Sequence, residues 1–558
     1  MSNKKPILLL GGIGAVTGLA AIGAAIYLNV NSSDPKDIVF TAFKNIVSEE
    51  QISPLEDVFG ITQILKTVED SPVEVNGKLS VLNTSIEDSQ LLNGAGSFVT
   101  LISDPDKKTG SVNAGISYAN MDLLNMQLYE DPSQISIMLP DMTDKVITLY
   151  LDDLSGQIET SPFIGQKLRE EGISPELIKI YMENVSTIKE DSKNLSDIPA
   201  LWNRYKEEAE TVKEFKEAIL IEKIDKREFI IDGDVEKCKG YHVIVPKDSA
   251  VLFLRSTKDF IFNDQDFINS FTDYCESANE MQNAMYQEMK KNMDQEYVDY
   301  ISEPEQLNAD EILKEADKRI SEWIDTVETN AKDVISNVYV RKNGNLASFT
   351  VNTVYGNDDN SYGVYGECDF GGGYSQLSNL TGNLRITDPK SRAITINIDK
   401  NGSYNKEKEI SDYGTISVNV GESEQVVVYD AMYKISDGSY SLKLECNADQ
   451  DEVYSFSSTG TVKDITKGKS ITINADHIKY EFSDTDSDGE EITGFVTLEG
   501  MCSMKPFSGT IEKPDGTEFN LLSATEEEFQ TLVNEMLQRT MTGVISRASD
   551  KVGQIEIP

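Results

Sequence analysis

Apolar side chains recur at every second position through most of residues 338–513. This period puts alternate side chains on opposite faces of a strand, so that one face can be buried and the other wet. Gly, Asp and Asn cluster between the runs, as expected for tight turns. The segment therefore predicts a long antiparallel sheet. The clearest sets are Ile394/Ile396/Ile398, Ile416/Val418/Val420, Tyr440/Leu442/Leu444, Ile471/Ile473 and Ile478/Tyr480/Phe482.

Residues 73–162 show the same period on a smaller scale. Leu124, Met126 and Leu128 form one apolar set, and Ile135 and Ile137 belong to another set that follows a turn. We expect an antiparallel meander there. The two β-rich regions share this character but show no residue-by-residue repeat.

Helical signals separate and flank the strands. We expect helices from Pro35 and over residues 55–68, from Pro175 with breaks to about 220, and over residues 263–336, followed by a closing helix after Thr525. The capping residues are Asp34, Asn308 (with Glu311) and Thr525 (with Glu528). Leu313, Ile320, Val327 and Val334 repeat every seven residues, joined by Ala316 and Trp323, and Phe529, Leu532, Val533, Met536 and Leu537 form the expected buried face of the last helix.

These elements predict an α+β fold with one or two large curved antiparallel sheets backed by helices, preceded by an N-terminal transmembrane helix. We divide the chain into an anchor with a short cytoplasmic tip (1–33) and a half-barrel-like domain with helical inserts (34–400). A β-rich region (401–522) and a C-terminal helix and tail (523–558) follow.

The transmembrane prediction rests on residues 7–30, which contain no ionisable side chain. About 20 apolar residues suffice to cross a membrane. Lys4 and Lys5 precede the segment, so we expect a cytoplasmic N-terminus and an extracellular main body. A cleaved signal peptide, with a new terminus near Ala25, is the alternative.

Charge limits the partners. The chain has 558 residues with 51 Lys and Arg against 95 Asp and Glu, a net charge of −44. Such a surface repels the phosphates of nucleic acid, which we exclude as a partner. The five cysteines are far apart and odd in number, so zinc spacing is absent, at least one thiol is unpaired, and we expect buried free thiols.

Recognisable catalytic motifs are missing from the sequence. The two histidines, His242 and His477, both lie in strand-like runs, and neither a GxSxG nor an HExxH motif occurs. We assign no catalytic, cofactor-binding or metal-binding residue. The best metal candidate is the run Asp484, Asp486, Asp488 and Gly489, which resembles a calcium loop but has Phe495 at the twelfth position. An acidic hairpin loop explains the run as well.

The order of an anchor, a short helix, a meander, a helical insert and a strand pair resembles the bacterial lipoprotein-carrier superfamily of the LolA and LppX type. The likeness is carried by residues 35–47, by residues 233–246 and by the segment VYVRKNGNLASF that begins at Val338. It implies a half-barrel over helices that holds acyl chains. The chain as a whole also resembles an uncharacterised family of membrane-anchored bacterial surface proteins. It lacks the carriers' lipid-modified cysteine, and residues 400–513 exceed a minimal carrier.

The sequence therefore leaves three functional hypotheses. The first is a non-enzymatic, membrane-anchored extracellular binding protein with an apolar or lipid-like ligand. The second is a structural or partner-binding surface module with a packed core. The third is a hydrolase that uses a pair of carboxylates, which leaves no local sequence signature.

Overall fold

The computed structural model describes residues 34–46, 53–85, 87–119, 121–170, 174–181, 188, 210–292, 302–356, 361–421, 423–448, 452–485 and 491–545. Its main element is one open sheet of 20 strands. The strands are β1 (Val73–Thr84), β2 (Ala95–Asp104), β3 (Thr109–Tyr118), β4 (Met121–Asp131), β5 (Gln134–Met138), β6 (Lys145–Tyr150), β7 (Leu220–Ile231), β8 (Asp234–Val245), β9 (Val334–Val340), β10 (Leu346–Tyr355), β11 (Tyr362–Gly372), β12 (Asn379–Thr387), β13 (Ala393–Asn405), β14 (Glu409–Val420), β15 (Ser423–Lys434), β16 (Ser439–Ala448), β17 (Glu452–Thr466), β18 (Ser470–Thr485), β19 (Glu491–Pro506) and β20 (Thr517–Asn520).

The strands follow one another across the sheet in chain order from β7 to β19, and β19 then pairs with β1. Strands β2 to β6 continue the series, and β20 closes it beside β6 in the one parallel pairing among the described strands. The β1–β19 ladder runs from Val73↔Pro506 to Thr84↔Val496 and joins the two β-rich regions. Because β13 passes through residue 400, the expected boundary there falls inside a strand.

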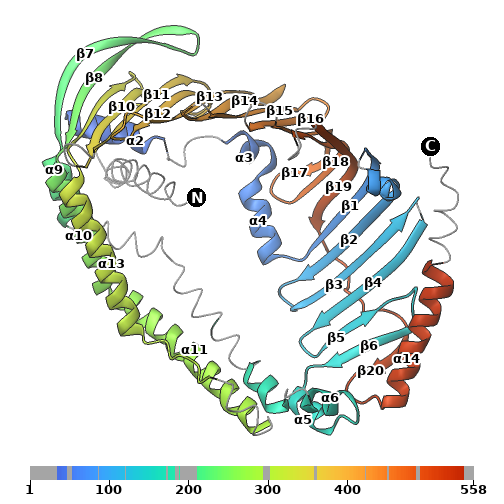
Figure 1. Cartoon of the computed structure of the whole chain (residues 1–558). Helices are drawn as coiled ribbons and strands as arrows, with labels where there is room; N and C mark the ends of the chain where they lie inside the picture. The colour runs from blue at the N-terminus through green and yellow to red at the C-terminus, as the bar shows by residue number, and fades with distance from the viewer. Residues whose placement is uncertain are drawn as a thin grey trace.

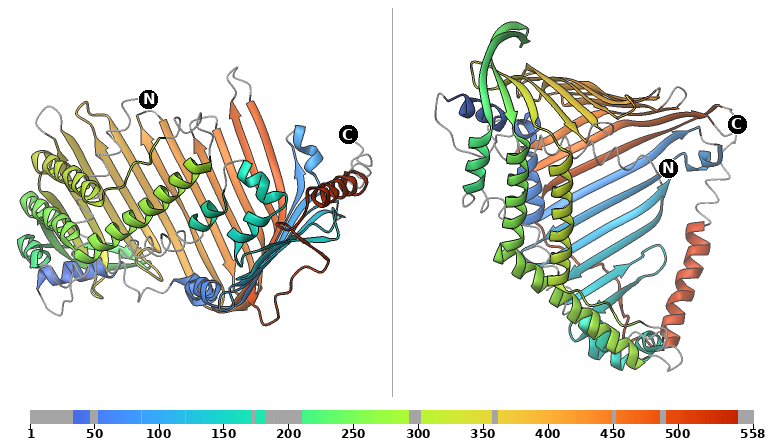
Figure 2. Two further views of the ribbon diagram at one scale, coloured as in Figure 1. Left: turned by 90° about the horizontal axis from the view of Figure 1, so that it is seen from below. Right: turned by 60° about the vertical axis from the view of Figure 1, so that its left-hand side comes forward.

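The sheet curves into an arc, and a row of helices spans its opening (Figure 1). The helices are α2 (Pro35–Lys44), α3 (Pro54–Phe59), α4 (Ile61–Asp70), α5 (Leu154–Thr160), α6 (Ile164–Glu170), α9 (Glu210–Ala218), α10 (Lys247–Asn263), α11 (Gln265–Asn292), α13 (Ala309–Asn330) and α14 (Glu526–Arg539), with a 3₁₀ turn at Glu87–Leu92 and a π turn at Thr540–Ile545. Helices α10 and α13 pack through Val251, Ile324 and Val327. At the far end of α11, the Ser174 hydroxyl donates to Glu288 at 2.9 Å. Figure 2 shows these helices opposite the strands in two further views.

The predicted α+β class, with a large curved antiparallel sheet backed by helices, is confirmed. The caps are also confirmed, because Asp34, Asn308 and Thr525 each accept a hydrogen bond from the first turn of their helix. No helix among the described residues is long and apolar enough to cross a membrane. The predicted anchor, residues 7–30, lies outside the described residues.

Four boundaries differ from the expectations. The helix expected over residues 55–68 is two helices, because Gly60 adopts a left-handed φ of 67° between them. The meander ends at Tyr150, and α5 follows it. Helix α10 occupies residues for which the sequence indicated no element. The predicted heptad ends early, because Val334 begins β9 and pairs with Val245.

The principal core lies where α2 and α9 cover the inner face of β8 to β11. Phe40 and Phe43 of α2 are buried there against Tyr241, Val338 and Val340. At the other end, α14 packs on β6 and β20 through Leu532 and Phe519, with Ile147 half-buried beside them. Val533 and Leu537, expected in the buried face of α14, are exposed.

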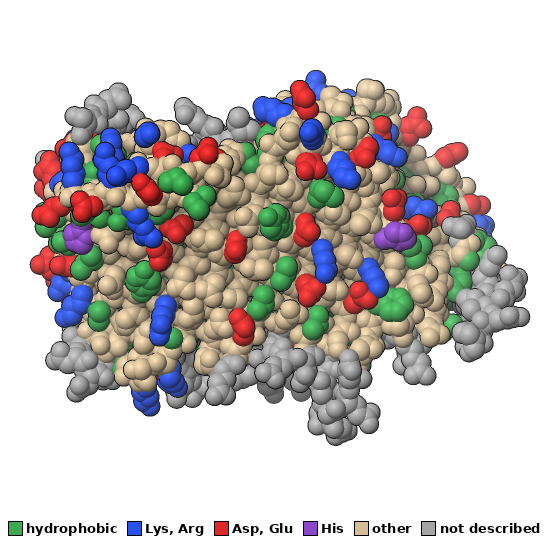
Figure 3. Space-filling view, turned by 90° about the horizontal axis from the view of Figure 1, so that it is seen from above, with side chains coloured by type: hydrophobic (Ala, Val, Ile, Leu, Met, Phe, Trp, Pro, Cys, Tyr) green, Lys and Arg blue, Asp and Glu red, His purple; other side chains and the backbone are tan. Residues whose placement is uncertain are grey.

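The outer face of the arc is polar. Hydrogen-bonded side chains cross the strands, as where Asn397 accepts from Asn383 and donates to Ser417 at 3.0 Å. A similar row joins Thr100 to Asn76 at 2.8 Å. Acidic and basic side chains are interspersed over the face seen from above (Figure 3). Water can therefore solvate this side of the sheet.

Helices α3 and α4 form an elbow inside the arc. Phe59 of α3 packs on the inner-face residues Ile410, Tyr433 and Val462, and the N–H of Gly468 in the β17–β18 turn donates to its carbonyl at 2.8 Å. Asp57 anchors the elbow to two turns of the sheet, since it lies 2.8 Å from Lys406 Nζ and 3.5 Å from Lys467 Nζ. It also accepts a hydrogen bond from Tyr404 at 2.7 Å.

The Asp57 contacts predict how the elbow responds to pH. Hydrogen bonds from Lys406 and Tyr404, with the nearby lysine charges, lower the pKa of Asp57 from 3.8 to about 2. A depressed carboxyl pKa stabilises the fold above pH 3.8, and this contribution disappears as the pH falls through about 2. We therefore expect Asp57→Asn to raise amide hydrogen exchange in residues 54–70 at neutral pH, and acidification of the wild type to do the same. Unchanged exchange in Asp57→Asn would show that Asp57 does not hold the elbow.

Candidate functional site

The inner face of the sheet is apolar over nearly its whole width. Directly opposed residues of antiparallel neighbours share a face, so the register connects Met126, Ala114, Val99, Gly77 and Cys502 through successive strands. All five period-two sets of the sequence analysis fall on this same face. Helices cover its two ends and part of its middle, and several inner-face side chains stay exposed. These are Leu79, Val99, Leu101, Ile116, Ile398, Ile416, Leu442, Leu444, Ile473 and Tyr480.

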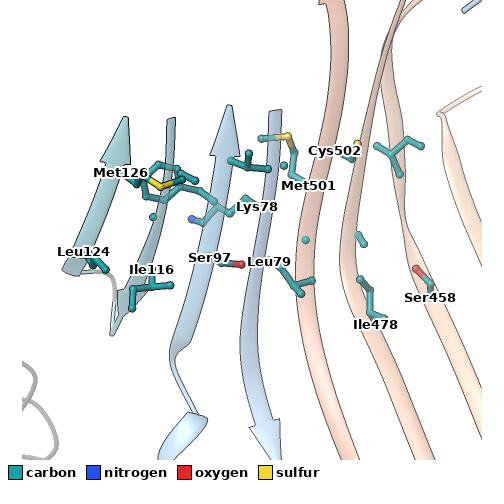
Figure 4. Close-up of a pocket in the computed structure, with 18 of the residues that line it drawn as sticks. Lys78, Leu79, Ser97, Ile116, Leu124, Met126, Ser458, Ile478, Met501 and Cys502 are labelled. Atoms are coloured by element: carbon teal, nitrogen blue, oxygen red, sulfur yellow. The ribbon is translucent and has the colours of Figure 1, made fainter. Parts of the chain in front are cut away.

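The part of this face that no described helix covers contains a cavity of about 770 Å³, called here the trough. It crosses β16 to β19 and continues over β1 to β4 (Figure 4). Seven strand spacings of about 4.8 Å make this span about 34 Å wide. Its lining residues are Gly77, Lys78, Leu79, Ser97, Phe98, Val99, Ala114, Gly115, Ile116, Leu124, Met126, Tyr440, Ser458, Ile473, Ala475, Ile478, Gly500, Met501 and Cys502.

Small residues form the floor of the trough. Ala475 and Gly500 oppose each other on adjacent strands, and Gly77 and Ala114 lie on the neighbouring row. Larger side chains flank them, among them Ile473, Ile478, Leu79 and Ile116. A strand that lacks large side chains leaves space above its backbone. The rows of small residues between larger side chains therefore form a hollow in the sheet surface itself.

Helix α4 presents further apolar surface inside the arc, where Figure 1 shows it beside the strands that carry the trough. Its Thr67 hydroxyl donates to the Gly468 carbonyl at 3.0 Å, which turns that side of the helix toward the β17–β18 turn. Ile61, Leu65 and Val68 lie on another side at helical spacing, and Leu65 is 61% exposed. Helix α4 has no buried residue, so its apolar side has no covering layer among the described residues.

Polar groups are sparse in the trough. Ser458 exchanges a hydrogen bond with the Tyr440 hydroxyl at 3.0 Å, so both groups are satisfied. Lys78 is the charged residue in the lining of the trough. Elsewhere on the inner face Lys400 lies 2.9 Å from Asp412, which also accepts a hydrogen bond from Tyr429 at 2.9 Å. Burial, with this hydrogen bond, raises the pKa of Tyr429. The lining of the trough therefore suits an apolar ligand. Its few polar side chains do not form a pair that could act as general acid and base.

The groups considered in the sequence analysis lie away from the trough or outside the described residues, with one exception. His242 contacts Asn337 at 2.9 Å in β8, and His477 lies in β18 on the polar face. Asp486 and Asp488 lie outside the described residues, and no group of three or more metal-binding side chains occurs among the residues described. The pKa values of Asp57, Asp131 and Glu236 are displaced downward by hydrogen bonds and nearby cations, which is the opposite of the raised pKa of a catalytic acid.

The exception is Cys502, which lines the trough and is exposed. All five cysteines are free thiols, and only Cys238 and Cys275 are fully buried, so the expectation of buried free thiols holds for these two. The sequence analysis missed Gly77, Ala114, Ala475 and Gly500 as site residues. These residues could have been found in the sequence as small residues at positions where the period-two pattern otherwise has a large apolar side chain.

Comparisons with known proteins assign no family to the chain. No protein-family model matches it, and no curated protein matches it at a significant level. The resemblance to lipoprotein carriers therefore stays a prediction.

Thiol reactivity provides a test of the trough geometry. We expect a maleimide reagent to modify Cys502 first in the folded protein and to leave Cys238 and Cys275 unmodified, with peptide mapping by mass spectrometry as the measurement. Cys502 is exposed, whereas burial raises the pKa of Cys238 to about 11 and removes the reactive thiolate. Earlier labelling of either buried thiol would contradict the described packing.

Proposed function

We propose that this chain is a membrane-anchored, extracellular binding protein that holds an apolar, lipid-like ligand in the trough. The observation that carries the proposal is an apolar cavity of about 770 Å³ on the part of the inner sheet face that no described helix covers. Ligand pockets of proteins usually enclose about 300–1,000 Å³ and are mostly apolar. The width of about 34 Å derived from the strand spacing suits a long, flexible hydrocarbon better than a compact ring.

Exposed aliphatic side chains favour an occupant over a structural role alone. Single exposed apolar residues are ordinary, but a contiguous apolar patch usually marks an interaction site. Leu79, Val99 and Ile116 are neighbours on β1, β2 and β3 and all remain exposed. A purely structural module with a packed core has no need of such a surface, whereas a partner-binding module, the other form of the alternative function, would cover it with a protein.

The proposed location rests on the sequence. The apolar segment at 7–30 would place the sheet just outside the membrane, since α2 begins only a few residues after it. A binding site there has direct access to lipids and other apolar molecules of the membrane. The carrier resemblance points to the same class of ligand.

A charge placed in the trough tests the proposal. We expect Ile116→Glu to reduce ligand occupancy about tenfold or more, because it replaces an apolar contact with a charged group. Ile116 is 49% exposed, so the change should leave the melting temperature nearly unaltered. The measurement is mass spectrometry of organic extracts from purified residues 34–558.

The matched control is Asn113→Glu, on the same strand but the polar face, where residue 113 is exposed. It adds the same charge and should retain full occupancy. An unrelated protein purified in parallel identifies background lipid. Equal amounts of an extracted molecule from both variants would place it outside the trough, and no stoichiometric apolar molecule in any extract would count against the binding function.

A further inference from the structure

A second cavity, of about 430 Å³, lies at the edge of the sheet where three hairpins turn. The turns between β7 and β8, β9 and β10, and β11 and β12 meet there, beside Asn45 at the end of α2. Its lining is polar, with Asp232, Arg341, Asn343, Asn345, Tyr374 and Gln376 among the residues. This composition is the opposite of that of the trough, and the two cavities share no lining residue.

The three turns are fixed to one another by hydrogen bonds. Asp232 adopts a positive φ of 56°, its N–H donates to the Gly371 carbonyl at 2.9 Å, and its carboxylate accepts from the Gly373 N–H at 2.6 Å. Arg341 donates to Asp232 at 3.3 Å and to Glu236 at 3.1 Å. Gln376 accepts from the Leu346 N–H at 3.0 Å. The polar groups are thus held in place before any ligand arrives, which lowers the cost of binding.

Several hydrogen-bond donors in this cavity remain available. Arg341 uses Nε and one Nη2 position, and its Nη1 group has no partner among the described residues. The side-chain oxygens of Asn343 and Asn345 accept hydrogen bonds, while their amide nitrogens donate none within the described structure. The Tyr374 hydroxyl likewise makes no hydrogen bond to any described group. A ligand rich in oxygen acceptors would satisfy these donors.

The charge around the cavity argues against an anion. Arg341 is paired with two carboxylates, Asp232 and Glu236, which offset its positive charge. A phosphate or sulfate would meet these carboxylates and be repelled. The ligand that fits is therefore uncharged and carries several oxygens.

We propose that this cavity binds a neutral saccharide of one or two rings. Hydroxyl and ring oxygens of a sugar accept hydrogen bonds from the free amide and guanidinium groups and from the Tyr374 hydroxyl, since Tyr374 lines the cavity. The volume exceeds that of a single water, about 30 Å³, more than tenfold, so a sugar ring can enter by displacing water. This inference does not depend on the function proposed for the trough.

The test is a calorimetric titration of the full chain, in a detergent without a sugar headgroup. The probes are glucose, galactose, mannose, N-acetylglucosamine and their β-1,4-linked disaccharides. We expect saturable binding of at least one of them. Tyr374→Phe should weaken it about three- to tenfold by removing one hydroxyl, and Arg341→Lys about tenfold or more by removing the Nη1 donors.

Tyr413→Phe is the matched control, because Tyr413 is 53% exposed on the polar face of β14, and this variant should bind like the wild type. Circular dichroism and melting temperature establish that each variant is folded. Absence of saturable binding to every probe would overturn the inference. Wild-type affinity in both cavity variants would also overturn it, as would binding of acetate or sulfate in place of the neutral sugars.

Discussion

The apolar inner face of the sheet is the constraint on which the rest of the structure depends. Each strand that follows the period-two pattern adds another row of aliphatic side chains to the same side, and all of these must be kept from water. Short helices can cover only a few strands each, as α2 does through Phe40 and Phe43. Curvature helps, because it turns the apolar face inward and lets α10, α11 and α13 span the opening. The strands between these covered regions are left with an open surface.

Glycines on the inner face are consistent with that curvature. Bending brings the inner side chains of neighbouring strands together, so positions without a side chain relieve the crowding. A Cβ at Gly414 would clash with the carbonyl of Asp399, and one at Gly460 with the carbonyl of Asn474. Both glycines belong to the apolar register of their strands. Gly77 and Gly500 of the trough lie on this same inner face, so small residues occur both in the curved strands and at the cavity.

Local sequence patterns predicted most helices and strands, but they could not predict which strands pair over long distances in the sequence. The alternation of Ile394, Ile396 and Ile398 identified a strand and its apolar face, and the capping residues placed three helix starts. Nothing local to Val73 indicates that it pairs with Pro506, because partner choice depends on the whole chain. The trough could not be predicted for the same reason, because only this ladder brings Gly77 and Leu79 of one β-rich region beside Cys502 and Gly500 of the other. Val334 misled because a seven-residue spacing continues by chance into the next strand.

An open apolar surface also links stability to occupancy. A ligand that binds only the folded state stabilises it, by about 2.7 kcal/mol at a hundred times its dissociation constant. In the empty protein, exposed side chains such as Ile116 and Leu65 remain in contact with water, which leaves the middle of the arc less stabilised than its covered ends. The elbow of α3 and α4 is held there by one small core and by the ion pairs of Asp57. A hydrocarbon between the trough and α4 would bury both apolar surfaces at once, so filling the trough and fixing the elbow would favour one another.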